Sequence, residues 1–212
     1  MSLLAQGLFP PGVVLKEATG TPVADPERLP PSERAVIAQA VPTRRAEFAH
    51  TRELARQALA ELGYSPVAIP RGERGAPCWP AGIVGSLTHT EGYRAAAVSQ
   101  TLTSVGIDAE PSGPLPDGVL DAIALPGERR RLAGYEELGL TGMDRVLFCA
   151  KEATYKTWFP VTRRWLGFEE ADIELFPDGR MRSRILAPQP EVAVIEGRWR
   201  VVGGFALVVG WL

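Results

Sequence analysis

Apolar residues recur with two different periods along the chain, and segments of the two kinds alternate. Two long stretches have apolar residues at helical spacing, 43–62 and 144–159. Short apolar runs bounded by turn residues predict strands over residues 83–88, 93–99, 104–109, 171–176, 181–186, 196–202 and 205–211. The order of one long helix followed by strands therefore occurs twice.

The expected ends of these elements follow from local chemistry. Thr43 is a suitable N-cap for the first long helix, and Gly63 is a suitable stop. Pro160 is expected to end the second long helix because it lacks an N–H group. Residues 1–42 are rich in proline and weakly periodic, with one short helix predicted to open at Pro31. Two shorter helical patches are predicted near residues 119–124 and 128–132.

The chain divides near residues 100–110 into two halves of similar plan, 1–104 and 105–212. This plan predicts an α+β fold of two similar halves, each an antiparallel sheet packed on one long helix. A groove between the halves is the natural place for a ligand.

Composition narrows the class of protein. The chain has 212 residues, of which 45% are apolar and 23% charged, which are ordinary values for a globular protein. A net charge of −2 disfavours a general nucleic-acid binder. Two cysteines and two histidines exclude a disulfide framework and a Cys- or His-rich zinc site. No apolar run is long enough to cross a membrane and no secretory signal is recognisable, so we expect a cytoplasmic protein with reduced thiols.

Two carboxylates alternate on the strand predicted over residues 104–109 and its end. Asp108 and Glu110 are two residues apart, so they project from the same face. Such a pair repels unless a positive charge lies between its members, and oxygen ligands suit Mg²⁺ or Mn²⁺. The alternative on spacing alone is a strand end with two solvated acids.

A charged pair lies on the second long helix. Glu152 and Lys156 are four residues apart and therefore neighbours. The alternative is a surface ion pair, which contributes little to stability. Phe148, Tyr155 and Trp158 make the surrounding sequence aromatic, which suits the edge of a cleft.

Arginines gather on the first long helix and in the glycine-containing loop after it. Guanidinium groups bind phosphate through two parallel hydrogen bonds, and glycines let backbone N–H groups approach an anion. His89, with Thr88 beside it, ends a strand and offers further phosphate ligands. The alternative is a solvated helix face, an ordinary turn and a structural histidine. The residues concerned are Arg44, Arg45, Arg52, Arg56, Arg71, Gly72, Arg74 and Gly75.

These features together indicate chemistry at a pyrophosphate. They supply carboxylates for a divalent cation, a lysine near them, and Arg/His sites for phosphates. Neither a Walker sequence nor a dinucleotide fingerprint is present.

Four short motifs resemble those of one family. Gly106-Ile-Asp-Ala-Glu110 and, further along, Phe148-Cys-Ala-Lys-Glu-Ala-Thr-Tyr-Lys156 resemble the paired signature of 4′-phosphopantetheinyl transferases, a (V/I)G(I/V)D-x-E strand and an F-(S/C)-x-K-E-(S/A)-x-x-K helix. Gly75-Ala-Pro-Cys-Trp-Pro80 resembles the family's G-(K/E)-P loop, and Ser86-Leu-Thr-His89 resembles its (N/S)-(I/L)-(S/T)-H strand. The length of the chain is similar to that of the family's monomeric class, which serves polyketide and nonribosomal peptide synthetases. The motifs are most similar to those of actinobacterial members.

The resemblance implies a pseudo-dimer of two α+β halves with coenzyme A in the cleft between them. It implies transfer of 4′-phosphopantetheine from coenzyme A to a serine of an apo acyl or peptidyl carrier protein, which becomes the holo form. Adenosine 3′,5′-bisphosphate is the expected by-product and Mg²⁺ the expected cofactor, with Mn²⁺ also suitable. The pathways implied are polyketide, nonribosomal peptide and fatty acid biosynthesis, with no nucleic-acid or membrane partner.

The resemblance also implies roles for individual residues. Asp108, Glu110 and Glu152 are expected to hold the metal, with Glu152 also the candidate general base for the serine hydroxyl. Lys156 is expected to stabilise or protonate the departing phosphate, and Asp108 completes the catalytic set. Residues 1–104 are expected to supply the nucleotide-side contacts, and residues 105–212 the metal and catalytic groups. The residues expected to bind coenzyme A are Arg44, Arg52, Arg71, Gly72, Glu73, Arg74, Thr88, His89, Asp108, Lys151, Tyr155, Lys156, Trp165 and Leu166.

Within this set, Lys151 is expected to contact a phosphate, whereas Tyr155, Trp165 and Leu166 are expected to line the pantetheine channel, with core packing as the alternative. Carrier-protein docking is expected on residues 111–142, whose basic members are Arg129, Arg130 and Arg131 beside Leu132. A solvated basic turn is the alternative there. Two rival functions use the same residues: a metal-dependent phosphohydrolase acting on coenzyme A or a nucleotide, and a non-catalytic coenzyme A-binding module.

Overall fold

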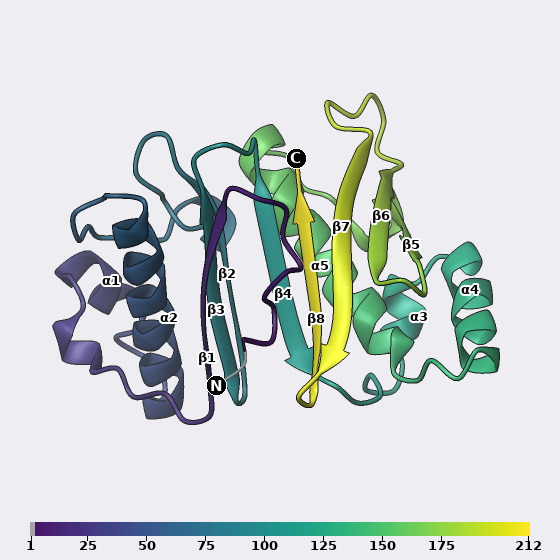
Figure 1. Ribbon diagram of the computed structural model, residues 1–212, viewed down its shortest axis with the longest axis horizontal. Helices are drawn as coiled ribbons and strands as arrows, with labels where there is room; N and C mark the ends of the chain where they lie inside the picture. Colours follow the sequence, from purple (N-terminus) through teal and green to yellow (C-terminus); the bar gives the residue numbers. More distant parts are fainter. Residues whose placement is uncertain (1–2) are drawn as a thin grey trace.

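Two antiparallel sheets lie side by side in the computed structural model, which describes residues 3–212 (Figure 1). The first sheet has the strand order β1-β3-β2, and the second has the order β4-β8-β7-β6-β5. Their bounds are β1 Val13–Thr19, β2 Val84–Thr90, β3 Tyr93–Ser99, β4 Val105–Pro111, β5 Ala171–Leu175, β6 Arg180–Ile185, β7 Val194–Val202 and β8 Phe205–Trp211. The predicted α+β fold with two antiparallel sheets is confirmed, although the second sheet is the larger.

One long helix packs on each sheet, as the repeated plan predicts. The long helices are α2 and α5, and the shorter ones surround them (Figure 1). The bounds are η1 Pro26–Arg28, α1 Pro31–Val36, α2 Pro42–Glu61, η2 Glu73–Gly75, α3 Val119–Ile123, α4 Pro126–Glu137, α5 Met143–Thr162 and η3 Phe168–Glu170. No helix within residues 3–212 is both long and apolar enough to cross a bilayer.

Each long helix buries its apolar face against its own sheet. Leu54 and Ala58 of α2 pack with Val98 of β3. Trp158 of α5 lies in a larger core with Ile195 of β7, and both side chains are fully buried. Burial of this kind supplies most of the stability of an amphipathic helix.

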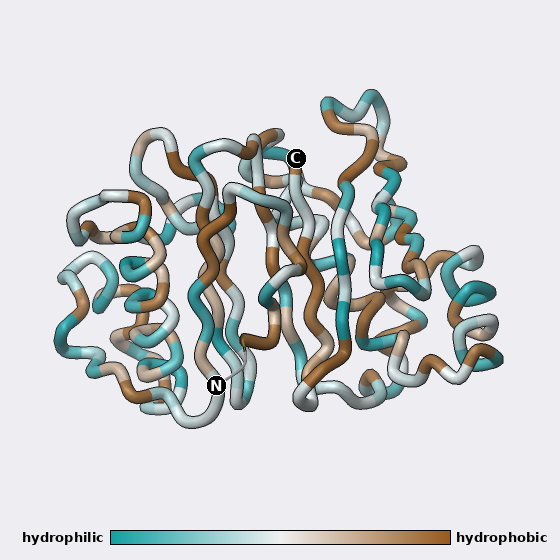
Figure 2. The backbone as a smooth tube through the Cα atoms, viewed as in Figure 1, coloured by the Kyte–Doolittle hydropathy of each residue, from teal (hydrophilic) through white to brown (hydrophobic). Residues whose placement is uncertain are grey.

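A third core joins the two sheets on the face away from the long helices. Ala5 and Leu8, from the segment before β1, pack with Tyr93 of β3, Ile107 of β4 and Leu207 of β8. This segment crosses in front of the central strands (Figure 1). Figure 2 shows that these central strands carry long hydrophobic stretches. The two sheets therefore share one apolar layer.

Side-chain hydroxyls bridge the two sheets where β2 and β4 lie next to each other. The backbone N–H of Ile107 donates to Ser86 Oγ at 3.1 Å, and that of Ala109 donates to Thr88 Oγ1 at 3.1 Å. These bonds replace a backbone ladder, since β2 and β4 belong to separate sheets. We call the line along which β2 and β4 meet the seam.

Glycines let α5 approach the second sheet without an intervening side chain. A Cβ on Gly106 of β4 would lie 3.0 Å from the backbone N of Thr157 and closer still to Ala153 O and Thr157 Oγ1. Gly210 of β8 pairs with Gly106, and a Cβ there would lie 2.9 Å from Thr157 Oγ1. The backbone of α5 therefore rests directly on β4, and the Thr157 side chain fills the space over Gly210 of β8.

Three details differ from the sequence expectations. β1 was not predicted, because its sequence, VVLKEAT, does not alternate apolar and polar residues as a half-buried strand usually does. In the structure all seven of its residues are half-buried. The N-cap of helix α2 is Val41 and the helix begins at Pro42, so the prediction of Thr43 as N-cap is wrong and Thr43 lies in the first turn. Helix α5 continues past Pro160 to Thr162 and ends at Arg163, whose φ is 56° and whose N–H donates to Phe159 O at 2.9 Å. Pro160 lies in the last turn, where one missing hydrogen bond does not end the helix.

We expect Gly106→Ala to lower the free energy of unfolding by about 3 kcal/mol, because the added methyl group forces α5 away from β4. Urea titration followed by circular dichroism measures the change as a lower midpoint. Gly134→Ala in α4 is the matched control, since nothing lies within 4 Å of the added Cβ. That control is expected to keep or raise stability by up to about 1 kcal/mol, and equal midpoints for the two variants would contradict the packing argument.

Candidate active site

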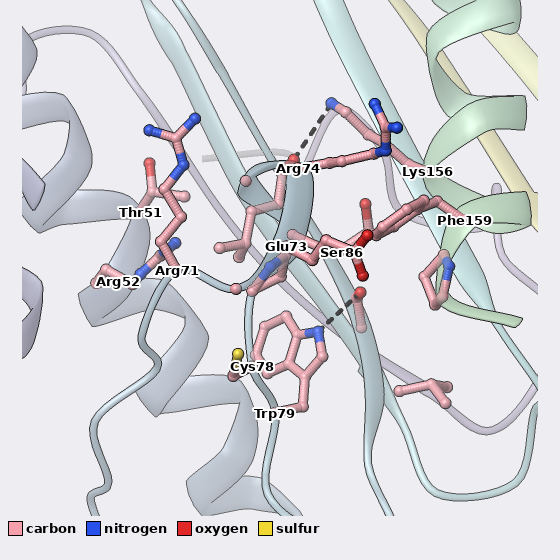
Figure 3. A pocket seen from close by; sticks show the side chains of 18 of the residues that line it. Thr51, Arg52, Arg71, Glu73, Arg74, Cys78, Trp79, Ser86, Lys156 and Phe159 are labelled. Atoms are coloured by element: carbon pink, nitrogen blue, oxygen red, sulfur yellow. Dashed lines mark hydrogen bonds between the residues drawn. The ribbon is translucent and has the colours of Figure 1, made fainter. Parts of the chain in front are cut away.

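A cavity of about 1040 Å³ lies between the two halves of the chain. Its walls come from α2, from the loop that contains η2, from β2, and from the C-terminal half of α5 (Figure 3). The groove expected between the two halves is therefore present.

The cavity is lined by more cations than anions. Its charged lining residues are Arg44, Arg52, Arg71, Arg74, Lys156 and Arg163, against Glu73 and Glu152. The whole chain has a net charge of −2. The positive charge is therefore local, and it suits a small ligand with several negative charges.

Arg52 is held rigidly in the wall formed by α2. Its Nε donates to Ile69 O at 3.1 Å, and its guanidinium lies 4.4 Å from the centre of the Phe48 ring. Burial lowers the pKa of Arg52 to about 10, with the charge of Glu33 acting in the opposite direction. The side chain therefore remains charged at pH 7 and is already oriented for an anion.

The loop of residues 71–79 forms a second wall. It is closed by a hydrogen bond of 2.7 Å from Gly72 N–H to Ala76 O, and Arg74 within it has a φ of 51°. The guanidinium of Arg74 lies 5.3 Å from the centre of the Trp165 ring, which belongs to the other half of the chain. Arg71, Glu73 and Arg74 of this loop line the same cavity as Lys156 (Figure 3).

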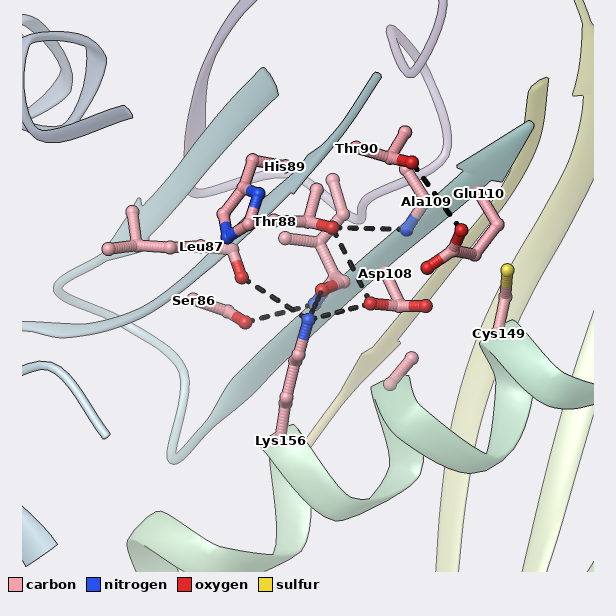
Figure 4. A network of polar contacts seen from close by, with 12 residues as sticks. Ser86, Leu87, Thr88, His89, Thr90, Asp108, Ala109, Glu110, Cys149 and Lys156 are labelled. Atoms are coloured by element: carbon pink, nitrogen blue, oxygen red, sulfur yellow. Dashed lines mark hydrogen bonds and ion pairs between the residues drawn. The ribbon is translucent and has the colours of Figure 1, made fainter. Parts of the chain in front are cut away.

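Lys156 connects the cavity with the seam. Its Nζ donates to Asp108 Oδ1 at 2.7 Å, to Ile107 O at 3.1 Å and to Leu87 O at 3.3 Å (Figure 4). The ammonium group therefore contacts both β2 and β4 and also faces the cavity.

Three carboxylates repel one another around this lysine. Asp108 is 6% exposed, and its Oδ2 has no hydrogen-bond partner within the described residues 3–212. Burial, followed by the charge of Asp108, raises the pKa of Glu110 and also that of Glu152. Thr90 donates to Glu110 Oε2 at 3.4 Å, and Thr88 donates to Asp108 Oδ1 at 3.5 Å.

The three carboxylates supply the oxygen ligands that a hard divalent cation prefers. A buried carboxylate oxygen without a partner and two further acids with raised pKa values are the features that Mg²⁺ or Mn²⁺ relieves. In the described part of the chain, however, no three His, Cys, Asp or Glu side chains lie close enough to ligate one ion. Bringing Asp108, Glu110 and Glu152 onto one cation therefore requires side-chain rotation.

His89 and Arg44 meet at the α2 side of the cavity. Arg44 Nη1 contacts both ring nitrogens of His89, with 2.7 Å to Nδ1. Glu47 Oε2 lies 3.6 Å from His89 Nδ1 and 3.7 Å from Arg44 Nη1. The structure therefore brings Arg44 and His89 together, and adds a carboxylate to them.

The remaining expected ligands lie around a smaller cavity of about 110 Å³. Trp165 and Leu166 line it, and Tyr155 lines both cavities. The Tyr155 and Trp165 rings are 5.1 Å apart. Trp165 is 60% exposed, so core packing does not describe it, whereas Leu166 both packs in the core and lines this cavity.

Lys151 also lines the smaller cavity, but its ammonium group is engaged within the fold. Its ammonium group forms a buried ion pair of 2.9 Å with Glu128 of α4, and it donates to Phe168 O at 2.7 Å and to Ala171 O at 2.5 Å. Both side chains of the pair are 1% exposed. The expected phosphate contact of Lys151 is therefore not supported, because all its donors are used to fix α4 and β5 to α5.

The basic region expected to dock a carrier protein is also engaged in the fold. Arg129 pairs with Asp121, and Arg131 pairs with Asp172. Leu132 is buried in the core. Arg130 alone is both exposed and without a carboxylate partner among residues 3–212.

Sequence reasoning missed two groups of residues at this site. Ser86 and Thr90 were not expected to contact β4, although Ser86 accepts a hydrogen bond from Ile107 N–H and Thr90 donates one to Glu110. Glu47 was not singled out at all. Its spacing of three residues from Arg44 on a helix was a usable signal, whereas its proximity to His89 depends on the tertiary fold.

Comparison with known proteins agrees with this geometry. The family model described as the 4′-phosphopantetheinyl transferase N-terminal domain matches residues 32–99, and that of the 4′-phosphopantetheinyl transferase superfamily matches residues 104–209. The chain is 49% identical over 193 residues to the 4′-phosphopantetheinyl transferase Npt of Nocardia iowensis, with 84% of this chain and 86% of that protein covered.

Two further relatives are similarly close. Identity is 50% over 189 residues with PptT of Mycobacterium tuberculosis, covering 84% of this chain and 83% of that protein. It is 46% over 212 residues with Svp of Streptomyces mobaraensis, covering 95% and 85%. Both are named 4′-phosphopantetheinyl transferases, and all three relatives come from actinobacteria, as the resemblance of the motifs implied. A two-halved fold, a cation-lined cavity between the halves and these matches lead to one conclusion: the chain belongs to the 4′-phosphopantetheinyl transferase family.

Proposed function

We propose that this transferase moves the 4′-phosphopantetheine group of coenzyme A to a serine of apo acyl or peptidyl carrier proteins, using Mg²⁺ or Mn²⁺ held by Asp108, Glu110 and Glu152. The observation that carries the proposal is the position of Lys156. One ammonium group touches a buried carboxylate of β4 and also faces a cavity lined by arginines. That combination suits a ligand with a pyrophosphate.

The two halves have different tasks in this proposal. Residues 1–104 bind the nucleotide end, which carries the phosphates, through Arg44, Arg52, Arg71, Gly72, Glu73, Arg74, Thr88 and His89. Residues 105–212 supply the metal ligands and the catalytic groups. The cavity supports this division because its arginine wall comes from α2 and the η2 loop, whereas Glu152 and Lys156 come from α5.

In the proposed reaction, the serine oxygen forms a bond to the phosphorus on the pantetheine side of the pyrophosphate, and the bond from that phosphorus to the bridging oxygen breaks. Glu152 accepts the serine proton, directly or through water, and adenosine 3′,5′-bisphosphate leaves. Lys156 offsets the negative charge on the leaving phosphate or protonates it. When bound, a divalent cation withdraws charge from the phosphate oxygens as the bond breaks.

The pantetheine arm needs an apolar path away from the charged cavity. The smaller cavity provides one, since Tyr155 and Glu152 line both spaces and Trp165 and Leu166 continue the wall. We assign the arm to this path.

The proposal also covers the partner proteins, the oligomeric state and the cellular compartment of the enzyme. The carrier proteins belong to polyketide, nonribosomal peptide or fatty acid synthesis, and the enzyme acts as a monomer because both walls of the cavity come from one chain. Cys78 and Cys149 are free, which is typical of the cytoplasm. Neither a membrane nor a nucleic acid is a partner in this proposal.

Glu152→Gln is expected to reduce transfer about 100- to 10,000-fold, which is the usual contribution of a general base. The substitution keeps the shape of a half-buried side chain, so the melting temperature should change little. Intact mass of an apo carrier protein, followed over time with coenzyme A and Mg²⁺, measures the rate. Glu137→Gln, on the exposed side of α4, is the control. Transfer at the native rate by Glu152→Gln would remove this residue from the mechanism.

Removal of divalent cations with EDTA is expected to abolish the mass gain, and added Mg²⁺ should restore it. Asp108→Asn should raise the Mg²⁺ concentration needed for half-maximal rate by at least about tenfold, because it removes the buried carboxylate. Asp117→Asn, at an exposed position before α3, is the control. Coenzyme A consumed without mass gain on any carrier type would instead indicate hydrolysis.

A further inference from the structure

Glu47 occupies a position that the proposed reaction does not use. It lies on α2, one turn after Arg44, and its side chain is only 16% exposed. Its Oε2 is 3.6 Å from Nδ1 of His89, which lines the cavity. A carboxylate that does not line the cavity therefore lies beside a histidine that does.

The other charged groups that face the imidazole are cations. They are Arg44 and Arg52 from α2, Arg94 from β3 and Lys156 from α5. Asp108 and Glu110 of β4 contact Thr88 and Thr90 instead, whose side chains leave β2 on the face opposite to that of His89. Glu47 is thus the carboxylate in contact with His89 within residues 3–212.

Without a ligand, this surrounding keeps His89 neutral. Burial, followed by the charges of Arg44, Lys156, Arg52 and Arg94, lowers the pKa of His89 to about 4. Arg44 Nη1 lies 2.7 Å from Nδ1 and is also close to Nε2, and a guanidinium donor needs one unprotonated ring nitrogen as its acceptor.

An anion bound beside Arg44 and His89 changes the hydrogen bonds that the His89 ring must make. A phosphate oxygen accepts hydrogen bonds, and so does the Glu47 carboxylate. If Nδ1 donates to Glu47 and Nε2 donates to the phosphate, both nitrogens must carry hydrogen. Arg44 is then free to donate to the phosphate as well.

We infer that Glu47 is a positioning residue that makes ligand binding proton-coupled: a phosphate group entering beside Arg44 and His89 is bound together with one proton, which the imidazole takes from solvent and Glu47 stabilises on Nδ1. The inference rests on the proposed function, which supplies the phosphate-bearing ligand. No covalent bond forms or breaks other than the new N–H bond of His89.

Affinity must then depend on pH in a defined direction. The ligand selects the protonated imidazole, so its dissociation constant rises by up to about tenfold per pH unit between the pKa of the free and of the bound state, and stays level below the free-state value. Loss of the Glu47 charge lowers the bound-state pKa and weakens binding at pH 7 by roughly 10- to 100-fold.

Nitrogen NMR of ¹⁵N-histidine-labelled protein reads the ring state directly. The chain has two histidines, and His50 does not line the cavity, so it serves as an internal reference. The probe is adenosine 3′,5′-bisphosphate at pH 7, with no carrier protein present. We expect His89 to change from a neutral tautomer to the imidazolium pattern when the probe binds, whereas His50 keeps its signals.

Variants separate the role of Glu47 from that of general charge. In Glu47→Gln, His89 should stay neutral with the probe bound, and the dissociation constant should lose its pH dependence. Glu53→Gln, at an exposed position of the same helix, should leave the His89 signals and the dissociation constant of the probe unchanged.

The outcomes distinguish two failures. Tight binding of the probe with His89 still neutral in the unsubstituted protein overturns this inference and leaves the proposed function standing. Absence of probe binding at millimolar concentration overturns the proposed function, and this inference with it.

Discussion

The direct contact of α5 with β4 and β8 is the constraint on which the site depends. Helix and sheet usually keep a layer of side chains between them, but Gly106 and Gly210 remove that layer at Thr157. One residue before Thr157, the Lys156 side chain is then near enough to reach Asp108 on β4 and Leu87 on β2. A helix held further out would leave Asp108 buried without a cation, at a cost that few folds tolerate.

The contact of α5 with the sheet brings Lys156 to the seam, where polar side chains of both sheets meet. Because β2 and β4 are joined through the hydroxyls of Ser86 and Thr88 and not through a backbone ladder, polar side chains from both sheets reach the same line. Acids lie on the β4 side and phosphate-binding candidates lie on the β2 and α2 side. Lys156 lines the cavity and contacts Asp108, so the positive wall of the cavity meets the acids of β4 at this residue.

Sequence alone predicted those features that depend on local periodicity and on motifs. The two long helices, most strands, the cavity between the halves and the Asp108–Lys156 neighbourhood follow from such patterns. What could not be predicted depends on partners distant in the chain. Lys151 and Lys156 both belong to one motif, yet only the fold shows that Glu128 of α4 takes the first. The sequence of strand β1 does not alternate, so its strand conformation depends on its pairing with β3, far along the chain.

The apolar layer shared by the two sheets has a consequence for how the enzyme unfolds. Ala5 and Leu8 begin the chain and Leu207 and Val209 end it, yet they pack in the same layer as Tyr93 and Ile107. Neither half can bury its own face completely if it is cut from the other. The two halves should therefore lose structure in one cooperative step, and fragments made by cutting near residue 102 should recover order only when mixed. The cavity walls, which come from both halves, form or disappear together.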